Sequence, residues 1–204
     1  MYLSRIQLDR RNPGIRQCMR DCQDMHRSLM GLFNSSRKEA GVLYRVFPKT
    51  MQVYLLSEKE PQAKQNMSGI EISGIQNIAS LENYFHAGAS YNFDILTSPC
   101  KKVEPDGGGN SRRRFLDTTA ERLEWLRRKG WQSGFEVLEA QEELQQAFYG
   151  KHNTEQGGKM FLSIVRFTGK LRIIDAEKFK AAWKDGIGSG RAYGLGMLLL
   201  RGTA

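Results

Sequence analysis

Residues 12–33 read NPGIRQCMRDCQDMHRSLMGLF, and this stretch decides how the first half of the chain folds. It opens on Asn12-Pro13, a pair that favours a helix start because Asn caps free N–H groups and Pro is tolerated at the first helical position. The apolar residues recur every three or four positions, so on a helix they form one stripe. The stripe comprises Ile15, Cys18, Met19, Cys22, Met25, Leu29, Leu32 and Phe33. The stretch therefore predicts one amphipathic helix, ended by the polar residues 34–36.

His26 falls near the middle of this apolar stripe. A titratable ring where an apolar side chain is expected breaks the local pattern, and such breaks tend to mark functional sites. A lone histidine on an apolar face is also commonly a core residue whose polar atoms are satisfied. On the helix alone, the second interpretation is the commoner one.

The segments around this helix alternate apolar and polar residues, as strands do. In the first half, strands are predicted over residues 1–8, 42–47, 51–56 and 69–75, which gives the order β-α-β-β.

The same order restarts in the second half of the chain. Strands are predicted over residues 91–97, 135–138, 160–167 and 195–200. Residues 99–111 read as a loop. Two helices begin at the capping residues Thr118 and Asp175 and end at Gly130 and Gly186.

Two such units in succession have the order of two ferredoxin-like domains. The sequence thus predicts the α+β class with two tandem ferredoxin-like (βαββαβ) domains. The first spans residues 1–85 and carries the helix with His26, and the second spans residues 86–204. The boundary is expected within residues 77–90, where the alternation lapses.

The chain is basic: its 204 residues hold 31 Lys and Arg against 22 Asp and Glu, a net charge of +9. This balance favours a polyanionic partner, with nucleic acid ahead of a membrane. No apolar run is long enough to span a bilayer, and residues 1–6 lack the apolar centre of a signal peptide. Three cysteines, an odd number, fit free thiols in a reducing compartment. We therefore expect a cytoplasmic protein with no membrane partner.

The motifs do not support a metal or a cofactor. Cys18, Cys22 and His26 follow one another at intervals of four, but positions eight apart on a helix are separated by about 12 Å along its axis, whereas zinc ligands converge to about 2 Å from one ion. The sequence also has no H-E-x-x-H, EF-hand, C-x-x-C or G-x-S-x-G motif. If this protein cuts its polyanion without a metal, RNA is the substrate that allows it. The RNA 2'-hydroxyl can attack the adjacent phosphate while a histidine moves the proton.

The second candidate site is the glycine-rich segment, residues 186–196, GIGSGRAYGLG. It follows a predicted helix and opens a strand, so it is neither a P-loop nor a Rossmann signature. Glycines at alternating places let backbone N–H groups point at an anion, and Arg191 lies among them. A helix C-cap and a tight turn would explain only one or two of the glycines. We therefore favour a phosphate contact.

Two further segments are rich in basic residues. Arg112, Arg113 and Arg114 precede the second-half helix, where guanidinium groups can fork onto phosphates. The exposed side of that helix is expected to add Arg122, Arg127, Arg128 and Lys129. The link over residues 150–159 suits a hairpin tip that enters a nucleic-acid groove, through Lys151, His152 and Lys159. A solvated charged surface is about equally compatible with the helix and with the link.

Several of these motifs resemble the CasE family, the CRISPR precursor-RNA endoribonucleases of the type I-E Cascade complex. The likeness runs nearly end to end and includes the opening Met-Tyr-Leu-Ser and the sequence His-Arg-Ser-Leu at residues 26–29. Its most specific part is the terminal run over residues 186–200. Residues 98–102, 113–129 and 167–169 support it.

The resemblance implies a metal-independent cleavage of CRISPR precursor RNA at the base of the repeat stem-loop, which leaves a 2',3'-cyclic phosphate. It also implies that the enzyme keeps the mature guide RNA and joins the other Cascade subunits. His26 aligns with the catalytic histidine of the family. The RNA contacts would come from Arg27, Arg112, Arg113, Arg114, Lys151, His152, Lys159 and Arg191, with the glycine nest Gly188, Gly190, Gly194 and Gly196.

Two positions depart from the family pattern. Gln23 stands where the family often has a tyrosine, one helical turn before the histidine. Glutamine can orient a hydroxyl or a phosphate but cannot act as a phenolic acid or base. Gln23 is therefore the second candidate catalytic residue, with an orienting role. Residues 97–99 read Thr-Ser-Pro where relatives often carry Arg-x-Asn-Pro.

Two other functions stay open. One is a non-catalytic, hairpin-RNA-binding subunit of a ribonucleoprotein complex, which Gln23 favours. The other is a small-molecule enzyme that acts on a phosphorylated metabolite, which the net charge disfavours.

Overall fold

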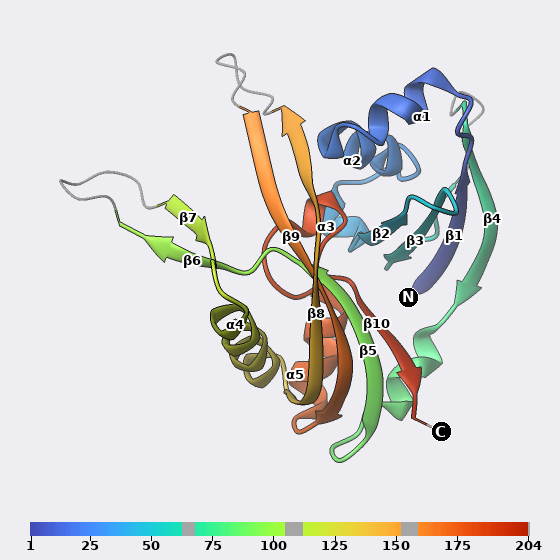
Figure 1. Cartoon of the computed structure of the whole chain (residues 1–204). Coiled ribbons are helices and arrows are strands. Elements are labelled where there is room, and N and C mark those ends of the chain that lie inside the picture. Colours follow the sequence, from blue (N-terminus) through green and yellow to red (C-terminus); the bar gives the residue numbers. More distant parts are fainter. Residues whose placement is uncertain (63–67, 105–111, 152–158, 204) are drawn as a thin grey trace.

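The computed structural model describes residues 1–62, 68–104, 112–151 and 159–203 (Figure 1). The first half forms a four-stranded antiparallel sheet in the order β2-β3-β1-β4. Its strands are β1 (Tyr2–Leu8), β2 (Leu43–Phe47), β3 (Gln52–Ser57) and β4 (Ile70–Asn77). Between β1 and β2 lie α1 (Pro13–Cys18), α2 (Cys22–Met30) and α3 (Arg37–Ala40), and the 3-10 helix η1 (Ala79–Tyr84) follows β4.

The second half forms another four-stranded antiparallel sheet, in the order β10-β5-β9-β8. Its strands are β5 (Ser90–Thr97), β8 (Phe135–Lys151), β9 (Lys159–Ile173) and β10 (Leu198–Gly202). The helix α4 (Thr119–Gln132) precedes β8, and α5 (Ala176–Asp185) and the 3-10 helix η2 (Arg191–Tyr193) precede β10. A small hairpin of β6 (Cys100–Val103) and β7 (Arg112–Phe115) is inserted before α4.

In both sheets the first strand lies between the third and the fourth, and the second strand lies at the edge. This is the strand order of a ferredoxin-like unit. The predicted α+β class with two ferredoxin-like units is therefore confirmed. The boundary between residues 85 and 86 stays a prediction.

The single helix predicted over residues 12–33 is wrong, because the structure divides it into α1 and α2. The Asp21 side chain accepts hydrogen bonds from the N–H groups of Gln23 and Asp24 and so starts a second helix. The apolar stripe nevertheless packs as expected. Its members Ile15, Met25 and Leu29 are buried in one cluster with β1 and β3 residues.

The strands predicted over residues 135–138 and 160–167 are much too short. β8 and β9 form a long hairpin that extends past its own sheet toward α2 (Figure 1). Register shifts between Val137 and Glu139, and again between Gln145 and Phe148, interrupt the alternation on β8. An edge strand with such bulges loses the period of two on which a strand prediction depends.

Two smaller boundaries also differ from the predictions. The segment expected to be a loop over residues 99–111 contains β6 and leads into β7. The helix α4 passes Gly130, which packs closely on Phe135, and ends at Gln132, before Gly134 with a φ of 78°.

The two halves share apolar and ionic contacts. Leu43 and Leu56 of the first sheet belong to the same buried cluster as the core of the second sheet. Asp94 of β5 accepts a 2.6 Å hydrogen bond from Arg45 of β2 and a 2.7 Å bond from Arg166 of β9. Burial alone would raise the pKa of Asp94, but the bonds from Arg166 and Arg45 outweigh it and lower the pKa. This ionised carboxylate joins β2 to the second sheet.

Within the described residues, no helix is both long enough and apolar enough to cross a membrane.

Candidate functional site

His26 projects from the side of α2 toward the glycine-rich segment of the second half. Its ring meets the Tyr193 ring edge-on, with centroids 6.3 Å apart and planes 75° apart. The imidazole is half-buried, and its Nδ1 atom is out of solvent without a hydrogen-bond partner among the described residues. A structural core histidine normally has its buried polar atoms paired. His26 therefore does not fit the interpretation as a satisfied core residue.

The surroundings of His26 favour its neutral form. Burial, followed by the positive charge of Arg37, lowers the pKa of the imidazole below its ordinary value. A histidine that is neutral at pH 7 can accept a proton from a hydroxyl group. The site is therefore suited to general-base chemistry.

Two tyrosines, Tyr44 and Tyr193, hold the glycine-rich segment beside α2. The Tyr44 hydroxyl donates a 3.0 Å hydrogen bond to the carbonyl of Ala192. Burial raises the pKa of Tyr44 well above its ordinary value, and burial with the neighbouring Cys22 and Asp21 raises that of Tyr193. Both phenols therefore stay protonated at neutral pH. The sequence reasoning singled out neither of them, and the one available signal was that Tyr193 is the large aromatic residue of a glycine-rich run.

The glycines of this segment serve its close packing. A Cβ atom on Gly194 would lie 3.0 Å from the Tyr44 ring, and one on Gly196 would lie 2.7 Å from the carbonyl oxygen of Ile187. The N–H of Gly196 is already bonded to the carbonyl of Leu96. Gly190 likewise faces Leu195 rather than open space. These contacts account for three of the glycines by packing, while Gly188 also borders a cavity.

That cavity has a volume of about 690 Å3 and lies between the glycine-rich segment, α4 and the β6–β7 hairpin. Its described lining includes five basic side chains and no acidic one: Lys101, Lys102, Arg113, Lys129 and Arg191. We call it the basic cavity. Backbone from Gly186 to Ser189 completes one wall, and Trp125 lies behind Gly188. Lys101 pairs with Glu121 at 3.3 Å, but the lining as a whole is positively charged, and such a hollow favours a polyanion.

The family model for "CRISPR associated protein" matches residues 1–202 of this chain. The chain belongs to this family. The match spans nearly the whole sequence and confirms the family membership that the motifs predicted.

A curated relative is similar to part of this chain, and two solved structures share its fold. The CRISPR-associated endoribonuclease Cse3 of Thermus thermophilus is 32% identical over 120 residues, which are 54% of this chain and 55% of Cse3. The alignment thus spans about half the length of that relative. The structure of Thermus thermophilus Cse3 bound to an RNA representing a pre-cleavage complex has a TM-score of 0.80 at 22% identity, covering 98% of both chains. A chain of the CRISPR RNA-guided surveillance complex in its pre-nicking state has a TM-score of 0.78 at 22% identity over 100% of both chains.

In this CRISPR-associated protein, Gln23 lies on the same helix as His26, whereas Arg27 and Arg114 form ion pairs at the surface. Gln23 stands in the first turn of α2, three residues before His26 and so on the same side of the helix. Arg27 is exposed and pairs with Asp24. Arg114 is also exposed and pairs with Asp117 at 2.9 Å.

The predicted contacts on the long hairpin are described only in part. Lys151 ends β8 opposite Lys159, which begins β9, and Arg112 begins β7 opposite Val103. His152 lies outside the described residues.

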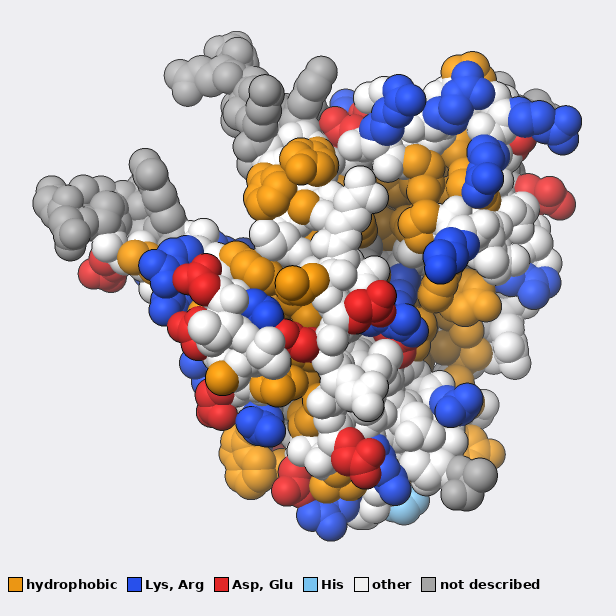
Figure 2. All heavy atoms as spheres, viewed as in Figure 1, with side chains coloured by type: hydrophobic (Ala, Val, Ile, Leu, Met, Phe, Trp, Pro, Cys, Tyr) orange, Lys and Arg blue, Asp and Glu red, His pale blue; other side chains and the backbone are white. Residues whose placement is uncertain are grey.

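The hairpin nevertheless contacts the helix that carries His26. A Cβ atom on Gly150 would lie 3.1 Å from the Cys22 Sγ and 3.3 Å from the Asp21 Oδ1. Beside it, the exposed rings of Tyr149 and Phe161 pack against one another with centroids 5.3 Å apart. Figure 2 shows hydrophobic side chains gathered at this end of β8 and β9. Exposed aromatic rings of this kind can stack on unpaired bases.

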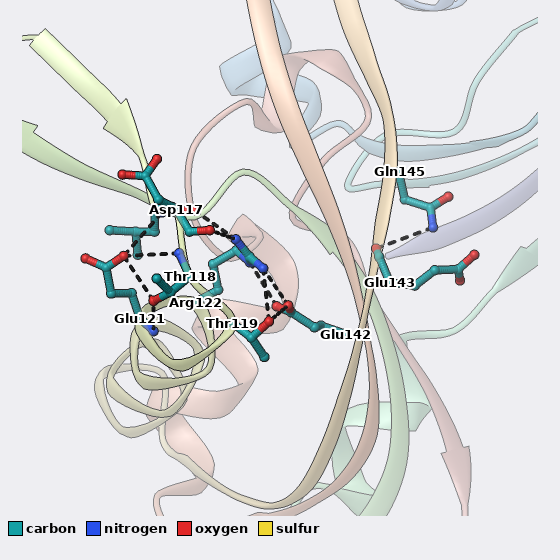
Figure 3. Close-up of polar contacts among 9 residues, drawn as sticks. Asp117, Thr118, Thr119, Glu121, Arg122, Glu142, Glu143 and Gln145 are labelled. Atoms are coloured by element: carbon teal, nitrogen blue, oxygen red, sulfur yellow. Dashed lines mark hydrogen bonds and ion pairs between the residues drawn. The ribbon is translucent and has the colours of Figure 1, made fainter.

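The prediction that Arg122 lies on the exposed side of α4 is wrong. Its side chain is 6% exposed and donates hydrogen bonds of 2.9 and 2.6 Å to Glu142 of β8. It also donates to the carbonyls of Leu116 and Asp117 (Figure 3). Arg122 therefore fixes α4 to the long hairpin rather than facing a ligand, whereas Arg127 and Arg128 are exposed as expected.

Arg37 is a further residue near the site that the sequence did not indicate. It begins α3, and its charge acts on His26. Among the described residues, no group of three His, Cys, Asp or Glu side chains is placed to hold a metal ion.

Proposed function

We propose that this protein is a site-specific endoribonuclease that cleaves CRISPR precursor RNA at the base of the repeat stem-loop, without a metal ion. The observation that carries the proposal is the half-buried, uncharged His26, which faces Tyr193 at the margin of the glycine-rich segment. The same segment lines the basic cavity through Arg191. The glycine-rich segment thus contacts the proton acceptor through Tyr193 and also lines a binding surface for polyanions.

The chemistry needs no group beyond the chain and the RNA. His26 accepts the proton of the 2'-hydroxyl through Nε2, since Nδ1 is buried. The freed oxygen attacks the adjacent phosphorus and the bond to the 5'-oxygen breaks. The leaving 5'-oxygen takes a proton from the His26 imidazolium or from solvent, so the products are a 2',3'-cyclic phosphate and a 5'-hydroxyl. Gln23 has an orienting role on the same side of α2.

The basic cavity and the long hairpin bind the stem. Five basic side chains of the cavity contact the phosphates of the stem: Lys101, Lys102, Arg113, Lys129 and Arg191. The affinity for RNA should therefore fall steeply as the salt concentration rises. Exposed Arg27 and Arg114, with Arg112, Lys151 and Lys159, extend this surface, and His152 is the further RNA contact that the family resemblance implies. The match to a chain of a CRISPR RNA-guided surveillance complex supports assembly with the other Cascade subunits after cleavage.

The test is incubation of repeat RNA with wild-type protein and with His26→Ala in EDTA. We expect full cleavage by the wild type and a loss of about 10² to 10⁴ in rate for the variant. Cleavage by His26→Ala at the wild-type rate would overturn the assignment. Tight binding of the stem-loop by wild-type protein without any product would instead favour the second candidate, a hairpin-RNA-binding subunit, to which Gln23 in place of a tyrosine points.

A further inference from the structure

Among the described residues, the half-buried Arg37 lacks the counter-charge that the buried Arg45 and Arg122 have. Its Nε atom is out of solvent and has no hydrogen-bond partner among the described residues. The Nε atom of Arg45 is also unpaired, but its guanidinium group bonds the carboxylate of Asp94 at 2.6 Å, and that of Arg122 bonds Glu142 at 2.6 Å. A charged group held in the protein without a partner is costly, so its retention calls for an explanation.

The acidic residue closest in sequence cannot neutralise Arg37. Glu39 lies two positions further along α3, but its carboxylate accepts from the N–H and the hydroxyl of Ser36 in a capping box. The α3 backbone is further fixed by Gly41, which ends the helix in the left-handed conformation, and by the N–H of Val42, which donates to the Arg37 carbonyl at 3.4 Å. The side chain of Arg37 is thus presented from a well-anchored turn.

The groups around Arg37 add positive charge. Burial, followed by the charge of Arg191, lowers the pKa of Arg37, and Tyr44 opposes this effect. The charge of Arg37 in turn lowers the pKa of His26. Arg37 of α3 thus acts on His26 of α2 and is itself acted on by Arg191 of η2, and among the described residues no carboxylate pairs with Arg37. An anion is the ligand that would relieve this arrangement.

We propose that Arg37 binds the phosphate whose bond is cleaved and holds it between His26 and Arg191. This inference rests on the proposed function and adds a residue to it. A guanidinium group offers a planar fork of N–H donors that matches two phosphate oxygens. Charge builds on these oxygens as the 2'-oxygen adds to phosphorus, so a donor already in place stabilises the transition state.

The neighbouring Lys38 provides a matched control. It lies on the same short helix, carries the same charge and is exposed. Arg37→Gln and Lys38→Gln therefore change the net charge equally, and only the first removes the guanidinium group beside His26. Arg37→Lys keeps the charge but loses the fork.

The experiment measures single-turnover cleavage of repeat RNA at saturating protein in EDTA. We expect Arg37→Gln to lower the rate by roughly 10² to 10³, as the loss of one oxyanion donor does. Arg37→Lys should recover part of the rate, and Lys38→Gln should cleave like the wild type. An unchanged rate for Arg37→Gln would overturn the inference.

A second measurement keeps the inference testable even if no RNA is cleaved. The pKa of the His26 ring is measured by NMR titration in wild type, Arg37→Gln and Lys38→Gln. The thermal unfolding midpoint of each protein shows that it is folded. Removal of the Arg37 charge should raise the His26 pKa toward its ordinary value and should weaken binding of RNA with a 2'-deoxy residue at the cleavage position. If His26 titrates and the 2'-deoxy RNA binds alike in all three folded proteins, Arg37 is not at the site. If the proposed function itself is wrong, His26→Ala will instead cleave repeat RNA at the wild-type rate.

Discussion

The ring of Tyr193 meets the ring of His26 edge-on at 6.3 Å, although the two residues come from opposite ends of the chain. His26 belongs to α2 of the first half and Tyr193 to η2 of the second. The candidate site therefore exists only where the two ferredoxin-like units meet. The contact between α2 and the end of β8 at Gly150 brings the long hairpin to the same place.

Removal of the Tyr193 ring should misplace His26. We expect Tyr193→Ala to lower single-turnover cleavage by at least tenfold, because small shifts of a catalytic group cost rate steeply. Tyr193→Phe keeps the edge-on contact and should retain most of the rate. Equal losses in both variants would show that the hydroxyl, not the ring position, matters.

The pH dependence of cleavage should report the lowered pKa of His26. Burial and the Arg37 charge both disfavour the imidazolium form, so the base form dominates at neutral pH. The single-turnover rate should rise with pH along a limb whose midpoint lies below 6.5, and should then stay level through about pH 8. A limb centred at or above 6.5 would contradict this account of the site.

The packing of the glycine-rich segment makes Gly196 sensitive to substitution. Its φ is 83°, and an added Cβ would also lie 2.7 Å from a backbone oxygen. Gly88 has a similar φ of 89° but nothing within 4 Å of the added atom. Gly88→Ala should therefore cost only about 1–2 kcal/mol of unfolding free energy, and Gly196→Ala distinctly more. Urea unfolding of both variants measures the difference, and equal costs would argue against the packing described for this segment.

The Arg122–Glu142 pair should matter for stability. Arg122→Met leaves Glu142 partnered by Thr119 alone and should cost about 3–5 kcal/mol, while the exposed Arg128→Met should cost almost nothing. The hydrogen bonds from Arg122 lower the pKa of Glu142 in the folded protein. The pair therefore stabilises the fold above the unfolded carboxyl pKa of about 4.3, and this contribution fades as the pH falls further. A stability gap between wild type and Arg122→Met that persists unchanged at about pH 3 would contradict the linkage.

Local sequence signals predicted the fold well. Thr118 and Asp175 cap α4 and α5 as expected, because a capping residue acts on N–H groups only two or three positions away. The strand segments β1, β2, β3 and β5 match their predicted ranges within two residues. The split between α1 and α2 was missed, although Asp21 carries the same capping signal, because the uninterrupted apolar stripe concealed it.

Contacts between distant residues were harder to predict. Arg122 was assigned to the surface because its partner Glu142 lies on a strand whose length the sequence did not reveal. Arg37 gave no local signal at all, since its significance depends on His26 and on Arg191 from the other half of the chain. Arg113, Lys129 and Arg191 were candidates, but their convergence on one cavity follows from the folded arrangement of β7, α4 and the glycine-rich segment.

The most direct test of the central claim is the end chemistry of the RNA fragments, determined by mass spectrometry after cleavage of repeat RNA in EDTA. If His26 activates the 2'-hydroxyl, the upstream fragment will carry a 2',3'-cyclic phosphate and the downstream fragment a 5'-hydroxyl, and a single 2'-deoxy substitution at the cleavage position will abolish both. Fragments with a 3'-hydroxyl and a 5'-phosphate, or cleavage of the 2'-deoxy RNA, would contradict the claim.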